Sequence, residues 1–227
     1  MKKTVLALAI AATTACAGVA QADVKVGFLG GFTGGIESLT PPIFDGAKLA
    51  MAEINEQGGL LDGEDMVMPS GDTTCSDASA ASNAADRLVN SEKVTAIVGA
   101  LCTGATIAAA NNAAIPGGVV MVSPASTAPA VTDLEDNDLV FRTVPSDAFQ
   151  GVQLAKLLLS KGIEDVAVTF VNNDYGQGLD DAFTKTFEAE GGTISANLAH
   201  EDNRADYRSE IGQLSSGGSQ TLVVLAY

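Results

Sequence analysis

The chain has 227 residues, of which 46% are hydrophobic and 18% charged, and its 24 glycines and 7 prolines are too few for a fibrous or low-complexity protein. The 12 basic residues stand against 28 acidic ones, which gives a formal net charge of -16. This excess of negative charge repels phosphate backbones and anionic lipid surfaces, so nucleic acid is not an expected partner. The length suffices for one large domain or two small ones.

The N-terminus has the three parts of a secretory signal peptide. A basic Met-Lys-Lys start is followed by an apolar run over residues 5–12, too short to span a bilayer, and by Ala-Gln-Ala at residues 20–22, a small-x-small cleavage site. We therefore predict residues 1–22 to be a cleaved leader and the protein to be periplasmic. A buried N-terminal helix is one alternative. A lipoprotein attached through Cys16 is another, although the residue three positions before it is not apolar.

Removal of such a leader would leave two cysteines, Cys75 and Cys102. In an oxidising compartment an even pair is more often a disulfide than a metal or redox site. Zinc is poorly supported, because His200 is the only histidine and neither cysteine has another ligand close to it in the sequence. We predict a disulfide, with two free buried thiols as the alternative, and we expect neither a metal ion nor a cofactor.

After the leader, apolar runs alternate with amphipathic stretches. The predicted strands are 24–29, 94–98 and 119–122, with a weaker one at 65–69, and the predicted helices are 44–56, 77–91 and 104–114. The runs at 94–98 and 119–122 are apolar throughout, as in strands that are buried on both faces. This pattern predicts a parallel sheet with crossover helices.

The pattern restarts after a polar stretch over residues 123–137. Helices are predicted at 147–160, 178–190 and 206–215, and strands at 166–171, 193–198 and 221–227. The fold class is therefore α/β, with two doubly wound parallel-sheet lobes, an N-terminal lobe over 23–143 and a partial C-terminal lobe over 144–227. Because an apolar strand without a covering helix ends the chain, we expect the second lobe to be incomplete and the sequence to be truncated at its C-terminus.

Motifs for nucleotide and hydrolytic chemistry do not fit. The loop at residues 30–35 has Phe32 where the dinucleotide-binding pattern needs glycine, and residues 99–106 have Ala105 where a phosphate loop needs lysine. A catalytic triad would have to use His200, which lies in a polar stretch typical of a solvated loop. We therefore expect no catalytic residue, and a secreted hydrolase or amidase remains only as an alternative that depends on this histidine.

The start of the predicted helix at Gly104 suits a bound anion. A helix that begins there, directly after the strand 94–98 and Thr103, points free backbone N–H groups and its positive dipole end above the strand ends. Without a fixed lysine or arginine, such a site suits a carboxylate better than a polyphosphate. Ordinary N-capping by Thr103 would account for this residue equally well.

Six blocks, in order along residues 24–227, carry a family resemblance. They are FDGAKLAMAEINEQGGL (44–60), the pair Cys75 and Cys102, VTAIVGALCTGAT (94–106), VMVSPASTAPAVT (120–132), VFRTVPSDAFQG (140–151) and NNDYGQGL (172–179). Together they resemble the periplasmic solute-binding proteins of branched-chain amino acid ABC transporters, of the Leu/Ile/Val-binding type. The resemblance implies a two-lobed clamp that binds an amino acid or a related carboxylate or amide and delivers it to a membrane permease. A ligand-sensing module of the same fold is the alternative.

The resemblance also implies site residues in the first lobe. Thr103 matches the position that holds the carboxylate of an amino acid through a hydroxyl and a backbone N–H, with Gly104 next to it. The ammonium group would meet the carbonyl of Ala125 and the hydroxyl of Thr127, and Ser126 lies between them.

In the second lobe, Tyr175 and Tyr227 match positions whose aromatic side chains close over the ligand. The first-lobe loop at residues 33–40 departs from the family pattern, because it has no aromatic residue and carries a carboxylate at Glu37. If Glu37 faces the cleft, it favours a polar, basic or amide ligand, and if it is exposed, it is ordinary surface charge. The family's acid that pairs with the ammonium group is expected beyond residue 227, so the identity of the ligand stays open.

Overall fold

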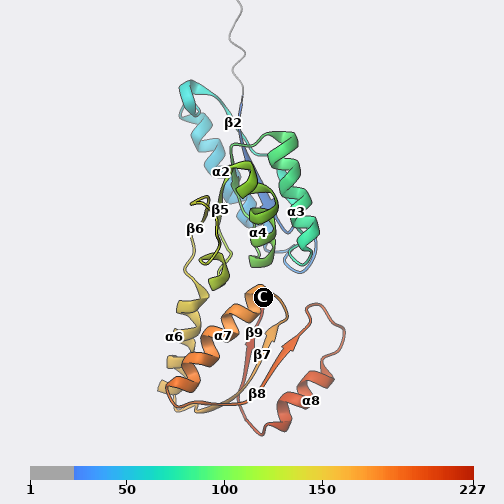
Figure 1. The fold of residues 1–227 in the computed structure, drawn as a ribbon, viewed down its shortest axis with the longest axis vertical. Helices are drawn as coiled ribbons and strands as arrows, with labels where there is room; N and C mark the ends of the chain where they lie inside the picture. Colours follow the sequence, from blue (N-terminus) through green and yellow to red (C-terminus); the bar gives the residue numbers. More distant parts are fainter. Residues whose placement is uncertain (1–22) are drawn as a thin grey trace, which may run out of the picture.

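The computed structural model of the protein describes residues 23–227. The predicted leader over residues 1–22, with Cys16, lies outside the described residues. Two α/β units, each with a sheet flanked by helices, are stacked end to end, and the chain passes between them from β6 to α6 (Figure 1). The C-terminus lies between the two units (Figure 1). Within the described range, no helix is both long and apolar enough to cross a membrane.

The first sheet is parallel, with strand order β2-β1-β4-β5-β6, and β3 also pairs with β1. Its strands are β1 (Val24–Gly30), β2 (Met66–Val67), β3 (Ser70–Asp72), β4 (Ala96–Val98), β5 (Val120–Ser123) and β6 (Val140–Arg142). The strands predicted at 24–29, 94–98 and 119–122 are confirmed. Of the weaker strand predicted at 65–69, only Met66–Val67 is a strand, and β3 lies just after the predicted range.

Helices on both sides cover the first sheet. They are α2 (Thr40–Glu56), α3 (Ala78–Asp86) with its continuation to Glu92, and α4 (Thr103–Ala109), which continues through Ala110–Ala114 into α5 (Ile115–Gly117). Short 3-10 turns lie at Leu61–Gly63 and, as η4, at Pro129–Val131. Helix α2 begins at Thr40 rather than at the predicted residue 44, with prolines in its first turn. Proline is tolerated there, because the first N–H groups of a helix have no partner within the helix.

The second sheet is also parallel, with strand order β8-β7-β9. Its strands are β7 (Asp165–Val171), β8 (Thr193–His200) and β9 (Leu222–Leu225), and its helices are α6 (Asp147–Ser160), α7 (Asp174–Ala189) and α8 (Arg208–Ser216). Helices α6 and α7 lie together on one face and α8 lies on the other (Figure 1). His200, predicted in a solvated loop, instead ends β8, with its Nδ1 2.8 Å from the Thr169 hydroxyl.

Helix α7 begins at Asp174, four residues before the start predicted from the sequence. Asn173 caps it, since its side-chain oxygen accepts a hydrogen bond from the N–H of Gly176 at 3.0 Å. The glycines of the NDYGQG segment therefore lie inside the helix, not in a turn. A Cβ at Gly176 would clash with the carbonyl oxygen of Val171, so close approach of helix and strand explains the glycine.

Candidate ligand-binding site

A cavity of about 210 Å³ lies between the two units, at the carboxyl ends of the strands. From the first unit it is lined by Ile36, Leu39, Ile43, Leu101, Cys102, Thr103, Ala125 and Thr127, and from the second by Gln150, Tyr175 and Tyr227. Ligands of open α/β sheets bind in this position. The volume is below the roughly 300–1,000 Å³ of pockets for drug-sized molecules, so the cavity suits a small metabolite.

Thr103 is the first residue of α4, and Cys102, not Thr103, is the N-cap. In the part of the chain that the structure describes, no side chain caps this helix. The N-capping explanation of Thr103 is therefore wrong. Its buried hydroxyl instead accepts a hydrogen bond from the N–H of Ala128 at 3.4 Å and keeps its own proton available for donation into the cavity.

A buried hydrogen-bond network supports the loop after β5. The Ser123 hydroxyl donates to the carbonyl of Ala100 at 2.6 Å and accepts from the N–H of Ser126 at 2.9 Å. The hydroxyls of Ser126 and Thr106 lie 2.7 Å apart. Ser126, predicted to contact the ligand, is thus buried beneath the loop, and its two neighbours in the chain line the cavity.

Arg142 of β6 fixes the far side of the same loop. Its Nη1 donates to the carbonyls of Thr127 and Ala128, each at 2.9 Å, and its Nη2 donates to the Thr132 hydroxyl. The N–H of Asp147 donates to the Thr127 carbonyl at 2.8 Å. The backbone of Thr127 is therefore held from behind, while its side chain lines the cavity.

The two tyrosines predicted to cover the ligand meet in the structure. The rings of Tyr175 and Tyr227 stack with centroids 4.8 Å apart and planes at 19°. Desolvation, with a smaller contribution from the charge of Asp147, raises the pKa of Tyr175. Desolvation also raises the pKa of Tyr227 to about 12, although half of the surface of this residue is exposed. Both hydroxyls therefore stay protonated at neutral pH and can donate hydrogen bonds.

Asp147, the first residue of α6, is a buried carboxylate that the sequence analysis treated only as the start of a helix. It is 1% exposed, and neither carboxylate oxygen has a hydrogen-bond partner among the described residues. Desolvation raises its pKa, while the Thr127 hydroxyl and the charge of Arg142 act in the opposite direction. Gln150, three residues further along the same helix, lines the cavity. This spacing on one helical face is the signal that could have pointed to both residues.

Two other predicted site residues lie outside the cavity lining. Glu37 is exposed. Gly104 instead faces the second unit, since a Cβ placed there would lie 2.8 Å from a carboxylate oxygen of Asp174. The apolar part of the lining, contributed by Ile36, Leu39, Ile43 and Leu101, was missed, because nothing in the sequence pattern separates these residues from ordinary core residues.

The predicted disulfide between Cys75 and Cys102 is present, with Cα atoms 5.4 Å apart. It links the segment after β3 to Cys102, which occupies the N-cap position of α4. Because Cys102 lines the cavity directly before Thr103, the bond also constrains this side of the site.

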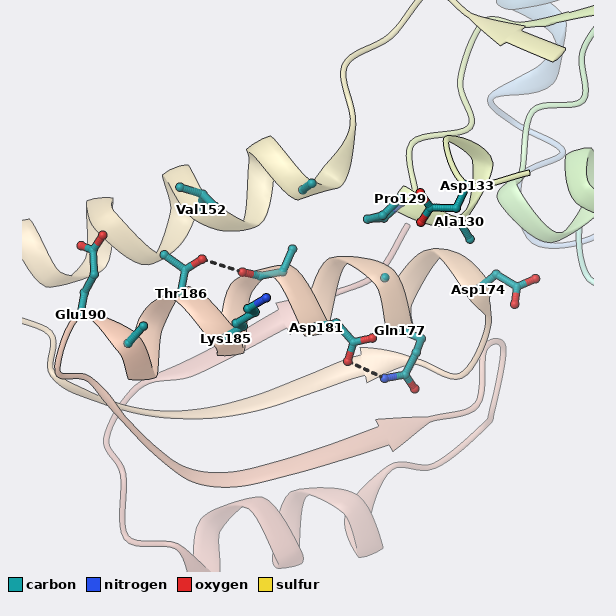
Figure 2. A pocket seen from close by; sticks show the side chains of 14 residues that line it. Pro129, Ala130, Asp133, Val152, Asp174, Gln177, Asp181, Lys185, Thr186 and Glu190 are labelled. Atoms are coloured by element: carbon teal, nitrogen blue, oxygen red, sulfur yellow. Dashed lines mark hydrogen bonds between the residues drawn. The ribbon is translucent and has the colours of Figure 1, made fainter. Parts of the chain in front are cut away.

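A second cavity, of about 680 Å³, runs along α7 where this helix meets α6 and η4 (Figure 2). Some of its polar side chains bond within α7, since Gln177 Nε2 donates to Asp181 at 3.0 Å and the Thr186 hydroxyl donates to the Ala182 carbonyl at 2.9 Å (Figure 2). Several of its side chains are acidic, and Lys185 is the only basic one among its lining residues. None of Thr103, Ala125, Thr127, Tyr175 and Tyr227 lines it, so the smaller cavity is the better candidate site.

Comparison with known proteins gives one family. A family model described as periplasmic binding protein matches residues 23–227. The Leu/Ile/Val-binding protein BraC3 of Rhizobium johnstonii is 34% identical over 196 residues, which are 86% of this chain and 52% of the relative. The Leu/Ile/Val-binding protein homolog 3 of Brucella melitensis is 30% identical over 229 residues, 99% of this chain and 60% of the relative.

Solved structures agree with this result. The leucine-binding protein LivK of Thermotoga maritima superposes with a TM-score of 0.80 at 29% identity, covering 88% of this chain and 55% of that one. LivJ of Streptococcus pneumoniae, in complex with isoleucine, superposes with a TM-score of 0.77 at 28% identity, covering 89% of this chain and 57% of that one. The chain thus spans about half the length of the relatives that it matches.

Proposed function

Because the chain belongs to the periplasmic binding protein family, we propose that it is the extracytoplasmic solute-binding component of an ABC importer and that its ligand is a branched-chain amino acid. The observation that carries this proposal is the small cavity, whose lining combines threonine and tyrosine side chains with apolar residues. The names of the relatives that are at least 30% identical, Leu/Ile/Val-binding proteins, support the same ligand class.

The lining residues suit the parts of such a ligand. The Thr103 hydroxyl donates to the carboxylate, and the carbonyl of Ala125 and the hydroxyl of Thr127 accept from the ammonium group. The aliphatic side chain packs against the apolar lining residues, and the stacked rings of Tyr175 and Tyr227 cover it.

Ligand binding would favour a closed arrangement of two lobes, residues 23–143 and 144–227. A ligand shifts an open–closed equilibrium only if it interacts better with one state, and contact with both lobes provides that difference. The closed protein would then deliver its ligand to a membrane permease. With export through the predicted leader, this event would take place in the periplasm.

The test is a thermal-shift and calorimetric screen of the protein expressed from its complete gene without the leader. The panel holds leucine, isoleucine and valine, together with acidic, basic and amide amino acids. A ligand at one hundred times its dissociation constant stabilises by roughly 2.7 kcal/mol, which raises the melting temperature by a few degrees. Binding of another class, with none of the branched-chain amino acids, would contradict the proposed ligand.

A substitution pair tests the position of the site. Thr103→Val keeps the shape of the side chain and removes its hydroxyl, and we expect leucine affinity to fall about tenfold, in line with roughly 1.5–3 kcal/mol for a hydrogen bond to a charged group. Thr95→Val is the matched control, because Thr95 is exposed and lies before the amino end of β4. Equal affinities of the two variants would contradict the site.

A further inference from the structure

The loop over residues 31–39, between β1 and α2, contributes two apolar side chains to the cavity lining, those of Ile36 and Leu39. This 31–39 loop is neither helix nor strand, so no regular ladder of backbone hydrogen bonds fixes its shape. A segment of this kind keeps one conformation only through contacts with other parts of the chain. The position of these two apolar side chains therefore depends on what holds the loop.

Asp72, the last residue of β3, joins the 31–39 loop to the neighbouring strand end. Its Oδ1 accepts from the N–H groups of Phe32 at 3.0 Å and Thr33 at 3.4 Å, and its Oδ2 accepts from the Thr33 hydroxyl at 2.6 Å. Its Oδ1 also accepts from the N–H of Thr74 at 2.9 Å. Desolvation acts to raise the pKa of Asp72, but these donors outweigh it and hold the pKa below its ordinary value. The group is thus ionised at neutral pH, and hydrogen bonds to an ionised acceptor are the stronger kind.

The segment on which Asp72 lies, residues 72–75, is itself fixed. Strand β3 pairs with β1 up to Asp72. Cys75 is bonded to Cys102, at the N-cap position of α4. Asp72 therefore joins a loop without regular structure to a segment that strand pairing and a covalent bond hold in place.

Close packing extends this attachment to the cavity lining. Gly34 has a positive φ of 91°, and a Cβ there would clash with the carbonyl oxygen of Thr74, within the 72–75 segment. A Cβ at Gly31 would lie 2.9 Å from Cγ1 of Ile36, whose residue is only 4% exposed. The loop thus lies directly on the segment that bears Asp72, and a displacement of the loop would move Ile36.

We propose that Asp72 is a positioning residue for ligand selectivity: by holding the 31–39 loop, it fixes the apolar wall of Ile36 and Leu39 and so limits the size of the ligand's side chain. The proposal rests on the proposed function. Asp72 is not among the lining residues of the cavity, so it acts through the loop. An apolar pocket discriminates by roughly 10–200-fold for one methylene group, and it does so only while its wall stays in place.

The experiment compares the binding of L-leucine and L-phenylalanine by calorimetry, on protein expressed from the complete gene without the leader. The two ligands share the ammonium and carboxylate groups, so the ratio of their dissociation constants reports on the apolar part of the site. Wild type should favour leucine. Asp72→Ala should reduce this preference about tenfold, because a loosened wall yields to the larger ring and loses its contacts with leucine.

The conservative variant should rescue the preference. Asp72→Asn keeps a carbonyl oxygen that can accept from the N–H groups of Phe32, Thr33 and Thr74, and it loses only the charge and one acceptor. We therefore expect its preference to lie within about threefold of the wild type.

A matched control separates positioning from stability. Asp136 also accepts from backbone N–H groups of a loop, those of Asp138 at 3.1 Å and Val140 at 2.9 Å, but it lies before the amino end of β6, away from the cavity lining. Asp136→Ala leaves these donors without their acceptor, so its melting temperature should fall. Its preference for leucine should equal that of the wild type.

A second variant tests the same contact at an exposed position. Thr33→Val removes only the hydroxyl that donates to Asp72, and surface substitutions of this kind leave the fold intact. The preference for leucine should fall about threefold. The same change made in Asp72→Ala should have little further effect, since both substitutions remove one bond.

Three results would overturn the role of Asp72 while leaving the proposed function intact. One is a wild type that binds leucine no better than phenylalanine. Another is an unchanged preference in Asp72→Ala or, if that variant does not fold, in Thr33→Val. The third is an equal loss of preference in Asp72→Ala and Asp136→Ala. A wild-type protein that binds none of the branched-chain amino acids would instead overturn the proposed function, and the Asp72 proposal with it.

Discussion

The part of the cavity lining that belongs to the first unit is here called the loop wall. It consists of loops and helix starts, which buried hydrogen bonds and a disulfide hold in place. On the side of the second unit, the cavity is lined by Gln150, Tyr175 and Tyr227, with Asp147 behind them, here called the helix wall. Hydrogen bonds hold the backbone of the loop wall from behind, while the Thr103 and Thr127 side chains line the cavity. The helix wall offers the stacked rings of Tyr175 and Tyr227. The loop wall is thus held by bonds within the first unit, whereas the helix wall consists of side chains from three separate segments of the second unit.

Two carboxylates, Asp72 and Asp147, differ in how their surroundings shift the pKa. Burial alone would raise the pKa of Asp72, at the end of β3, but hydrogen bonds from Thr33, Thr74 and Phe32 hold it below the ordinary value. Desolvation raises the pKa of Asp147, although the Thr127 hydroxyl and the charge of Arg142 act in the opposite direction. The donors around Asp72 therefore favour its ionised form, whereas burial favours the protonated form of Asp147.

The largest effect is expected from breaking the loop wall. Replacing both Cys75 and Cys102 by serine removes a bond across 27 positions, and the loop-entropy estimate for the loss of stability is about 3.5 kcal/mol. Urea unfolding of variant and wild type measures this loss. A reductant should lower the free energy of unfolding of the wild type by a similar amount. A loss below about 1 kcal/mol would show that the bond does not constrain the unfolded chain as expected.

The next effect concerns the approach of the two units. A Cβ at Gly178 of α7 would lie 3.0 Å from Pro129 and 3.1 Å from Ala128, which belong to the first unit. Gly178→Leu should hold the units apart and weaken leucine binding about tenfold by depleting the closed state. Gly212→Leu in α8 is the control, because a Cβ there has open space. Calorimetry that finds equal affinities would show that this contact does not limit closure.

The two carboxylates should give opposite pH dependences. Asp72 has a lowered pKa in the folded protein, so its stabilisation is present above the unfolded pKa near 3.8 and is lost as the pH falls through the folded value. Asp147 has a raised pKa, so stability present below pH 3.8 is lost as the pH rises through its folded value.

Denaturant unfolding across pH 3 to 8 checks both signs on ligand-free protein. In Asp147→Asn, the free energy of unfolding should no longer fall as the pH rises above the ordinary aspartate pKa. In Asp72→Asn, it should fall less than in the wild type as the pH is lowered through that pKa. An unchanged pH profile in Asp147→Asn would mean that this carboxylate is compensated in the folded protein.

The smallest effect is expected at Glu37. Its side chain is exposed and lies outside the cavity lining, so Glu37→Gln should change leucine affinity by less than about twofold, as for most rim charges. Calorimetry against leucine and against lysine measures it. A tenfold change for either ligand would assign the loop of residues 33–40 a part in specificity.

Much of the architecture follows from local sequence. The alternation of apolar runs with amphipathic stretches predicted parallel α/β units, because strands buried on both faces and crossover helices leave these patterns in the chain itself. The two cysteines predicted the disulfide from the compartment alone. Thr103, Ala125, Thr127, Tyr175 and Tyr227 were identified through the family resemblance, and the structure brings them to one cavity.

Only the tertiary structure decided how individual side chains are used. It placed Ser126 beneath the loop, Glu37 at the surface and the Asp147 side chain in the interior. Periodicity reports which face of an element is buried, but the partner of a polar group comes from segments distant in the chain. The Thr103 hydroxyl accepts from Ala128, 25 positions away, and no local pattern encodes that meeting.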